Sequence, residues 1–125
     1  MDNPPDLADR LLNYAVRIVR VVEALPKNLT GRRVGDQLLR SGTSVGAHYE
    51  EARGAELRDD FVHKLQVTLK ELRESNDWLR LIMRTEVLQG DRFADLVNES
   101  EQLRAILSKA IAKTKGKDKP KEPAG

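Results

Sequence analysis

The stretch Arg40–Ala55, RSGTSVGAHYEEARGA, decides the fold that the sequence predicts. It contains no proline and reads as a helix, yet Gly42 and Gly46 lie in its interior. Glycine inside a helix costs about 0.5–1 kcal/mol relative to alanine, so the missing side chains need a compensating gain. Gly35 lies on the same side of this helix, and Ser44 is nearby. A face of such small residues lets another helix approach closely. We therefore interpret Gly42, Gly46 and Ser44 as helix-packing or oligomer-interface positions, and predict that a leucine at position 46 would overpack the contact.

Hydrophobic periodicity around this stretch predicts four helices and no strand. The first is expected over 6–25, between a proline pair and Pro26. The second begins at Thr30, its expected cap, and runs to about 53; the third begins near 58 and reaches 86 or 87. Gly90 then breaks the chain, and Asp91 is expected to cap a fourth helix ending near 112. Short joints between four long helices predict an all-α, antiparallel, up-down-up-down four-helix bundle over residues 1–112.

The first predicted helix carries two apolar seams side by side. The first seam follows helical steps of three and four, and contains Leu7, Leu11, Tyr14, Ile18, Val21 and Leu25. The second seam runs beside it and contains Ala8, Leu12, Ala15, Val19 and Val22. Together they form a wider apolar face than one intramolecular contact usually needs. Two interpretations stay open: a deeply buried helix, or a face that partly meets another subunit.

Charge is distributed unevenly along the 125 residues. The net charge is +2, but residues 113–125 alone carry +3, which leaves −1 for residues 1–112. This C-terminal segment lacks large apolar residues and is predicted to be a disordered, lysine-rich tail. As a mobile positive charge it would bind RNA or DNA weakly and in a salt-dependent manner; the alternative is a solubilising terminus. The candidate polyanion contacts are Lys113, Lys115, Lys117, Lys119 and Lys121.

Two consecutive segments carry a family resemblance. Residues 37–55, QLLRSGTSVGAHYEEARGA, and residues 60–82, DFVHKLQVTLKELRESNDWLRLI, resemble the paired helices of the bacterial 23S rRNA intervening-sequence proteins. The resemblance covers about residues 7–112. His48 replaces the usual asparagine, and Thr68 stands where alanine is frequent. The matching positions are Arg40, Ser44, Ala47, Glu51, Lys64, Glu71, Glu74, Trp78 and Leu79.

This resemblance implies a ring-like homopentamer of antiparallel bundles with no established enzymatic activity. We therefore expect a non-enzymatic, self-assembling binding or scaffold module whose main partner is itself. The related accessory variability proteins of diversity-generating retroelements imply an alternative, an accessory protein that binds RNA or DNA through a basic surface. The near-neutral body of this chain differs from that branch.

Charged residues and one tryptophan are the remaining site candidates. Glu71 and Glu74 lie one turn apart near an apolar face, where a carboxylate needs a partner such as Arg40. With Glu51 we interpret these residues as a structural charge network or an intersubunit contact, with functional carboxylates as the alternative. Trp78 is expected to lie in the core or at an oligomer interface; stacking on a nucleic-acid base is the alternative.

No residue pattern predicts a catalytic, metal or cofactor site. Asp60 and His63 form one acid-x-x-His pair, but the second pair that a di-metal bundle requires is missing. The chain has no cysteine, which excludes thiol catalysis, thiolate metal sites and disulfides. No apolar run approaches the length of a membrane span, and no segment resembles a signal peptide. The expected location is the cytoplasm.

Overall fold

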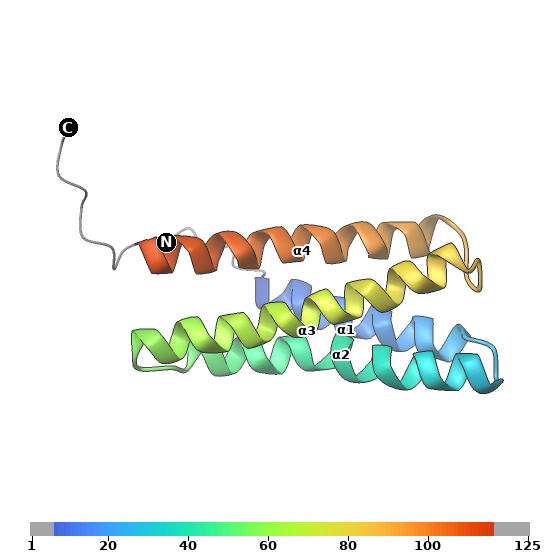
Figure 1. Ribbon diagram of the computed structural model, residues 1–125, viewed down its shortest axis with the longest axis horizontal. Helices are drawn as coiled ribbons and strands as arrows, with labels where there is room; N and C mark the ends of the chain where they lie inside the picture. Colours follow the sequence, from blue (N-terminus) through green and yellow to red (C-terminus); the bar gives the residue numbers. More distant parts are fainter. Residues whose placement is uncertain (1–6, 117–125) are drawn as a thin grey trace.

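Four long helices lie alongside one another and form an elongated bundle (Figure 1). The computed structural model describes residues 7–116, and these residues contain no strand. Helix α1 spans Leu7–Ala24, α2 spans Leu29–Arg53, α3 spans Arg58–Arg84 and α4 spans Asp91–Gly116. The predicted all-α fold with four helices is therefore confirmed.

Each helix packs against the next along the chain, and α1 also contacts α4. The α2–α3 contact is the most extensive and the α1–α4 contact the least, while the backbones of the diagonal pairs, α1 with α3 and α2 with α4, do not approach closely. Leucines from all four helices fill the centre, and Leu11, Leu38, Leu72 and Leu103 are fully buried. The apolar steps of three and four along each helix produce this core, since they place one stripe of each helix toward the others.

The ends of α2 and α4 are set by particular residues. The N-cap of α2 is Asn28, whose side chain accepts a hydrogen bond of 2.9 Å from the backbone N–H of Gly31. The predicted cap, Thr30, is wrong, because the helix has already begun at Leu29. Gly90 has a φ of 115°, a left-handed conformation that favours glycine, and α4 begins directly after it at Asp91.

Helix α4 runs through Gly116, so the predicted boundary between bundle and tail after residue 112 is too early. Ile111 is buried and anchors this last part of the helix. The hydroxyl of Thr114 donates a hydrogen bond of 2.8 Å to the carbonyl of Ala110, and Arg58 on α3 donates to the carbonyl of Thr114. Lys113 and Lys115 are therefore helical. The remaining tail lysines, Lys117, Lys119 and Lys121, lie outside the described residues.

The two apolar seams of α1 differ in how far they are buried. In the first seam Leu11, Tyr14 and Ile18 are fully buried in the bundle. The second seam faces outward in part: Leu12 is 62% exposed, and Val16 beside it is 47% exposed. The isolated bundle thus leaves an apolar strip of α1 uncovered.

Candidate functional site

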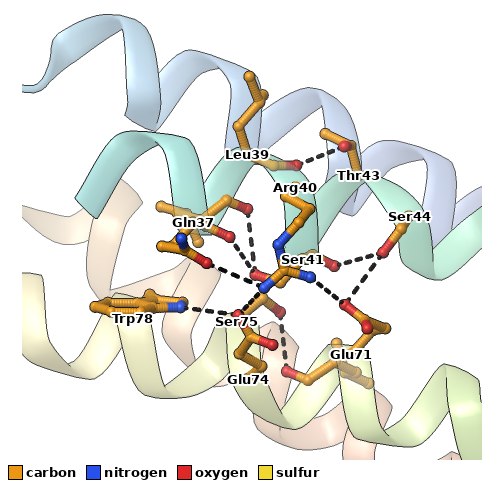
Figure 2. A network of polar contacts seen from close by, with 12 residues as sticks. Gln37, Leu39, Arg40, Ser41, Thr43, Ser44, Glu71, Glu74, Ser75 and Trp78 are labelled. Carbon is orange, nitrogen blue, oxygen red and sulfur yellow. Dashed lines mark hydrogen bonds and ion pairs between the residues drawn. The ribbon is translucent and has the colours of Figure 1, made fainter. Parts of the chain in front are cut away.

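Arg40 on α2 reaches across to two carboxylates of α3 (Figure 2). Its Nη1 donates a hydrogen bond of 3.1 Å to Oε2 of Glu71, and its Nη2 contacts Glu74. The same Nη2 also donates to Oε1 of Gln37, at 3.1 Å. The side chain of Glu71 is only 15% exposed, so this carboxylate needs its cationic partner. The structure thus brings together three of the four predicted network residues.

Glu51 does not join this network. It lies about three turns further along α2, where its Oε2 is 3.3 Å from Nδ1 of His48. This pair lies within one helix, at positions i and i+3, and both side chains are partly exposed. The prediction that Glu51 shares a charge network with Arg40 is therefore wrong. His48 occupies the position where the family usually has asparagine, and it is the polar partner of Glu51.

Ser44 and Trp78 lie at the edges of the network (Figure 2). The hydroxyl of Ser44 donates to the carbonyl of Ser41 at 3.2 Å and lies 3.5 Å from Glu71. The indole N–H of Trp78 donates to Glu74 at 3.2 Å. Trp78 is half-buried against the core, and together with Leu81 it lines an open surface hollow of about 340 Å³. Its indole is therefore held by Glu74 while part of the side chain remains accessible to solvent.

The two interior glycines of α2 differ in what surrounds them. A Cβ added to Gly42 would lie 2.7 Å from Cγ1 of Ile18, so this position holds α1 and α2 in close approach. A Cβ added to Gly46 would meet only Cβ of Leu11, at 4.0 Å, which is ordinary van der Waals contact. Gly46 is therefore not a tight packing position within the bundle, contrary to the predicted close approach, because Leu11 leaves ordinary space for a side chain here.

A buried polar layer crosses the core, and the sequence patterns did not predict it. The hydroxyls of Tyr14 and Ser75 are 2.7 Å apart. Asn76 donates to Oγ of Ser100 at 2.5 Å and accepts from Arg104 at 2.7 Å. Burial raises the pKa of Tyr14 to about 12, so its hydroxyl is neutral at physiological pH. The sequence signal that could have revealed this layer is a polar residue at a core position in the stripes of α1, α3 and α4.

Gly31 is a second position that the sequence patterns missed. A Cβ there would lie 1.8 Å from the carbonyl oxygen of Pro26, which leaves no room for a side chain. The sequence could have revealed this position, because a glycine stands three residues after Asn28, the residue that caps α2. This glycine lets the chain turn tightly from α1 into α2.

The cations of α1 are largely neutralised by α4. Arg10 pairs with Glu99 at 2.8 Å, and Arg17 pairs with Asp95 at 2.9 Å. Unpaired cations lie elsewhere in the described part of the chain: Lys70 and Arg73 on α3 line an open hollow of about 350 Å³ with Gln66, Leu69 and Ile111. The predicted polyanion contacts Lys113 and Lys115 occupy the last turn of α4.

Two exposed apolar surfaces complete the site candidates. The first, here the α1–α2 patch, consists of Leu12, Val16 and half-buried Val19 on α1 and Leu39 on α2; Leu39 is 38% exposed. The second, here the α3 patch, consists of Trp78 and Leu81 with Glu74 and Asp77, and Leu81 is 43% exposed. Scattered exposed leucines are normal, but apolar groups gathered on a surface mark interaction sites.

Within residues 7–116, no group of three or more histidine, aspartate and glutamate side chains is arranged to hold a metal ion. Asp60 and His63 are both exposed at the start of α3. None of the helices described is long and apolar enough to cross a membrane.

Four helices around a leucine core, with ionic contacts between neighbouring helices, define an all-α four-helix bundle protein. The chain belongs to the 23S rRNA-intervening sequence protein family, whose model matches residues 6–109. It is similar to a crystal structure of a protein of unknown function from the S23 ribosomal protein family of Bacteroides thetaiotaomicron. That similarity has 37% sequence identity and a TM-score of 0.77, and covers 84% of this chain and 97% of the other. None of the curated proteins compared with the chain matches it.

Proposed function

We propose that this protein is a non-enzymatic, self-assembling module that binds or scaffolds other molecules in the cytoplasm. Its unit is an antiparallel up-down-up-down bundle, and its assembled form is a homo-oligomer, a pentamer by the family resemblance. The ion pairs of α1 with α4 support the antiparallel arrangement, because Arg10 pairs with Glu99 while the later Arg17 pairs with the earlier Asp95.

One observation carries the self-assembly: an apolar strip of α1, formed by Leu12 of the second seam and the neighbouring Val16, is not covered within the bundle. Leu12 and Val16 extend outward at positions i and i+4, so they form a continuous strip rather than isolated exposed residues. Burying apolar surface contributes about 25 cal/mol per Å², which favours covering such a strip in an oligomer.

Light scattering at micromolar concentration tests the proposal. The expected result is five times the 14.1 kDa chain mass, unchanged over a tenfold dilution. Another multiple would correct the number of copies, and the mass of a single chain would contradict self-assembly.

Weak binding to RNA or DNA is the second candidate function, resembling that of the retroelement accessory proteins. The described C-terminal turn of α4 supports it with Lys113 and Lys115, and the sequence continues with three more lysines. Five such segments on one oligomer would bind a polyanion more tightly than one, because the second and later contacts become intramolecular.

A filter-binding titration with RNA, repeated over a range of salt concentrations, tests this candidate on two variants. Deletion of residues 117–125 combined with Lys113→Ala/Lys115→Ala is expected to remove most of the low-salt affinity and to leave the helices intact by circular dichroism. The matched variant Lys70→Ala/Arg73→Ala is expected to bind like the unaltered protein. If the tail variant kept its affinity and Lys70→Ala/Arg73→Ala lost it, the RNA contact would lie on α3, at the hollow lined by Lys70 and Arg73.

A further inference from the structure

A hollow of about 350 Å³ opens on the surface between α3 and α4. Gln66, Lys70 and Arg73 follow one another on α3 at steps of four and three, which places them on one side of the helix. Leu69 of α3, which is half-buried, and Ile111 of α4, which is buried, complete the lining. This surface, here the α3–α4 hollow, therefore combines an exposed cationic rim with an aliphatic floor.

Two hydrogen bonds between α3 and α4 lie on either side of the hollow. The side-chain oxygen of Asn76 accepts from Arg104 at 2.7 Å, and Arg58 donates to the backbone carbonyl of Thr114. The lining residues lie between these two contacts along both helices. The hollow is therefore formed by two helices that are tied to each other on both sides of it, as expected of a preformed site.

The cations of the hollow are not neutralised by their acidic neighbours in the sequence. Neither Lys70 nor Arg73 makes an ion pair within residues 7–116. Glu71 and Glu74, which follow them closely on α3, both bind Arg40 of α2. Two cations one turn apart on a helix also repel each other. An anionic group bound at the hollow would relieve this repulsion.

The helices around the hollow add positive charge. The α4 sequence from 102 to 116 contains four basic residues and no acidic residue. On α3, Asp77 lies one turn after Arg73, but it forms an ion pair with Arg80, at 3.9 Å. The α3–α4 hollow is therefore complementary in charge to an anionic partner.

We infer that the α3–α4 hollow docks a peptide segment of a partner protein, in which aspartate or glutamate side chains flank a leucine or another aliphatic residue. Arg73 can hold one carboxylate through two parallel hydrogen bonds, and Lys70 attracts a second as a point charge. The aliphatic residue of the segment would cover Leu69 and Ile111, and burying apolar surface favours binding. The inference rests on the binding role proposed above and names the class of partner, whatever the number of copies in the assembly.

The aliphatic floor favours a peptide over a nucleic acid at this site. Single-stranded nucleic acids gain affinity from bases that stack on aromatic side chains, and the five lining residues include no aromatic one. A phosphate backbone would meet the cations but has no aliphatic group to cover Leu69 and Ile111. We therefore expect an acidic peptide at the hollow and RNA at the lysines of the C-terminal segment.

Fluorescence anisotropy with the full chain and three labelled peptides tests the inference. The first peptide alternates aspartate and leucine, the second has serine in place of each leucine, and the third has lysine in place of each aspartate. We expect the first peptide to bind, the second to bind more weakly and to be released as salt is raised, and the third not to bind. The reason is that salt screens the charges but leaves the apolar contact.

Two double variants locate the contact. Lys70→Ala/Arg73→Ala should weaken binding of the aspartate–leucine peptide about tenfold, because two exposed charge contacts are lost. Arg20→Ala/Arg33→Ala is the matched control and should bind like the unaltered protein, because it removes the same charge from exposed positions on α1 and α2. All four side chains are exposed, and circular dichroism is expected to show unchanged helix content.

Reversal of the charge at the rim gives a readout that a misfolded variant cannot produce. Lys70→Glu/Arg73→Glu should lose the aspartate–leucine peptide and bind the lysine–leucine peptide instead, because Leu69 and Ile111 remain. A folded variant that binds neither peptide would show that charge at these two positions does not direct the docking.

RNA binding by the same variants separates the hollow from the C-terminal lysines. Lys70→Ala/Arg73→Ala should lose affinity for the peptide and keep it for RNA. The variant that lacks residues 117–125 and the charges of Lys113 and Lys115 should show the reverse. Loss of RNA binding in Lys70→Ala/Arg73→Ala would make the hollow a nucleic-acid site and overturn the inference.

Other outcomes also overturn it. An aspartate–leucine peptide that does not bind the unaltered protein, or binds Lys70→Ala/Arg73→Ala equally well, would exclude the hollow as its site. Equal losses in the two alanine variants would show a general attraction between charges, and equal affinity for the serine peptide would exclude the aliphatic floor. A monomeric mass in light scattering would contradict the proposed self-assembly, but it would leave this inference standing if the peptide still bound.

Discussion

Gly42 and Gly46 lie one turn apart on α2, and α1 is the helix next to both, yet their surroundings differ. At Gly42 the side chain of Ile18 occupies the space that a Cβ would need, and both residues are buried. At Gly46 the nearest atom, in Leu11, is at an ordinary contact distance, and the residue is half-exposed. The same residue type on the same helix therefore has two roles: a required close approach at one level and an open surface at the next. The four predictions below test this difference.

The largest effect is expected at the tight position. Gly42→Leu should lower the free energy of unfolding by about 3 kcal/mol, because the new side chain overlaps Ile18 in a filled core. Chemical denaturation followed by circular dichroism measures this change. Gly46→Leu is the matched control and should change stability by much less. Equal losses at the two positions would contradict the difference described here.

A double-mutant cycle should show that Ile18 is the cause of the cost at Gly42. We expect Gly42→Ala and Ile18→Ala each to destabilise the fold, and the double variant to lose about 1–2 kcal/mol less than the two losses added together. The reason is that removing the Ile18 side-chain branches frees the space that the new Cβ needs. Additive losses would show that the glycine is needed for another reason.

The buried hydroxyl of Tyr14 lies on α1 between Leu11 and Ile18, the residues opposite the two glycines. Tyr14→Phe should cost about 1 kcal/mol at neutral pH, because the hydrogen bond to Ser75 is lost while Ser75 keeps its bond to the Leu72 carbonyl. Stability of the unaltered protein should also fall as pH rises from 10 toward 12. The folded state retains a proton there, since burial raises the pKa of Tyr14 from 10.0 to about 12, whereas the unfolded state releases it.

Alkaline denaturation of Tyr14→Phe beside Tyr49→Phe checks this pH dependence. The pKa of Tyr49 is also raised by burial, but this side chain is half-exposed and belongs to the edge of the core. Most of the loss between pH 10 and 12 should disappear in Tyr14→Phe and remain in Tyr49→Phe. If the loss of stability instead remained in Tyr14→Phe and disappeared in Tyr49→Phe, the raised pKa of Tyr14 would be contradicted.

The smallest effect is expected at the open glycine and has the opposite sign. Gly46→Ala should raise the free energy of unfolding by about 0.5–1 kcal/mol, because alanine favours the helix and its Cβ meets no close neighbour. Thermal unfolding measures the shift, and Gly42→Ala is its matched control. A destabilised Gly46→Ala variant would restore the original prediction of a tight contact at this position.

The helices could be predicted from the sequence because apolar spacing is a local property. Leu7, Leu11 and Ile18 recur at helical steps, and the structure buries all three. The spacing of the glycines also placed them correctly on one side of α2. Their separate roles could not be read from spacing, because they depend on which side chain of α1 lies opposite each glycine, as Ile18 does opposite Gly42.

The charged network was predictable in part for the same reason. Glu71 and Glu74 are one turn apart near a buried stripe, which identifies carboxylates in need of a cation. The inclusion of Glu51 failed, because pairing across helices depends on their register, and a nearer partner was available in His48. The end of α4 was missed because lysines interrupt its apolar pattern, although buried Ile111 and the hydrogen bond from Arg58 to the Thr114 carbonyl still bind it to the bundle.

The weak contact between α1 and α4 has a consequence for the order in which the chain folds. Arg10 and Glu99 are separated by 89 positions in the sequence, so their contact closes almost the whole chain into a loop. The extensive α2–α3 contact joins helices that are neighbours in the sequence and are linked by a short turn. Forming it costs much less loop-closure entropy than forming the α1–α4 contact. The α2–α3 contact should therefore form early, and the contact between α1 and α4 should form late. The α1–α4 contact should also open first, so its backbone amides should exchange fastest among the helix contacts in native-state hydrogen exchange. Added salt should increase this opening by screening the ion pairs between the two helices.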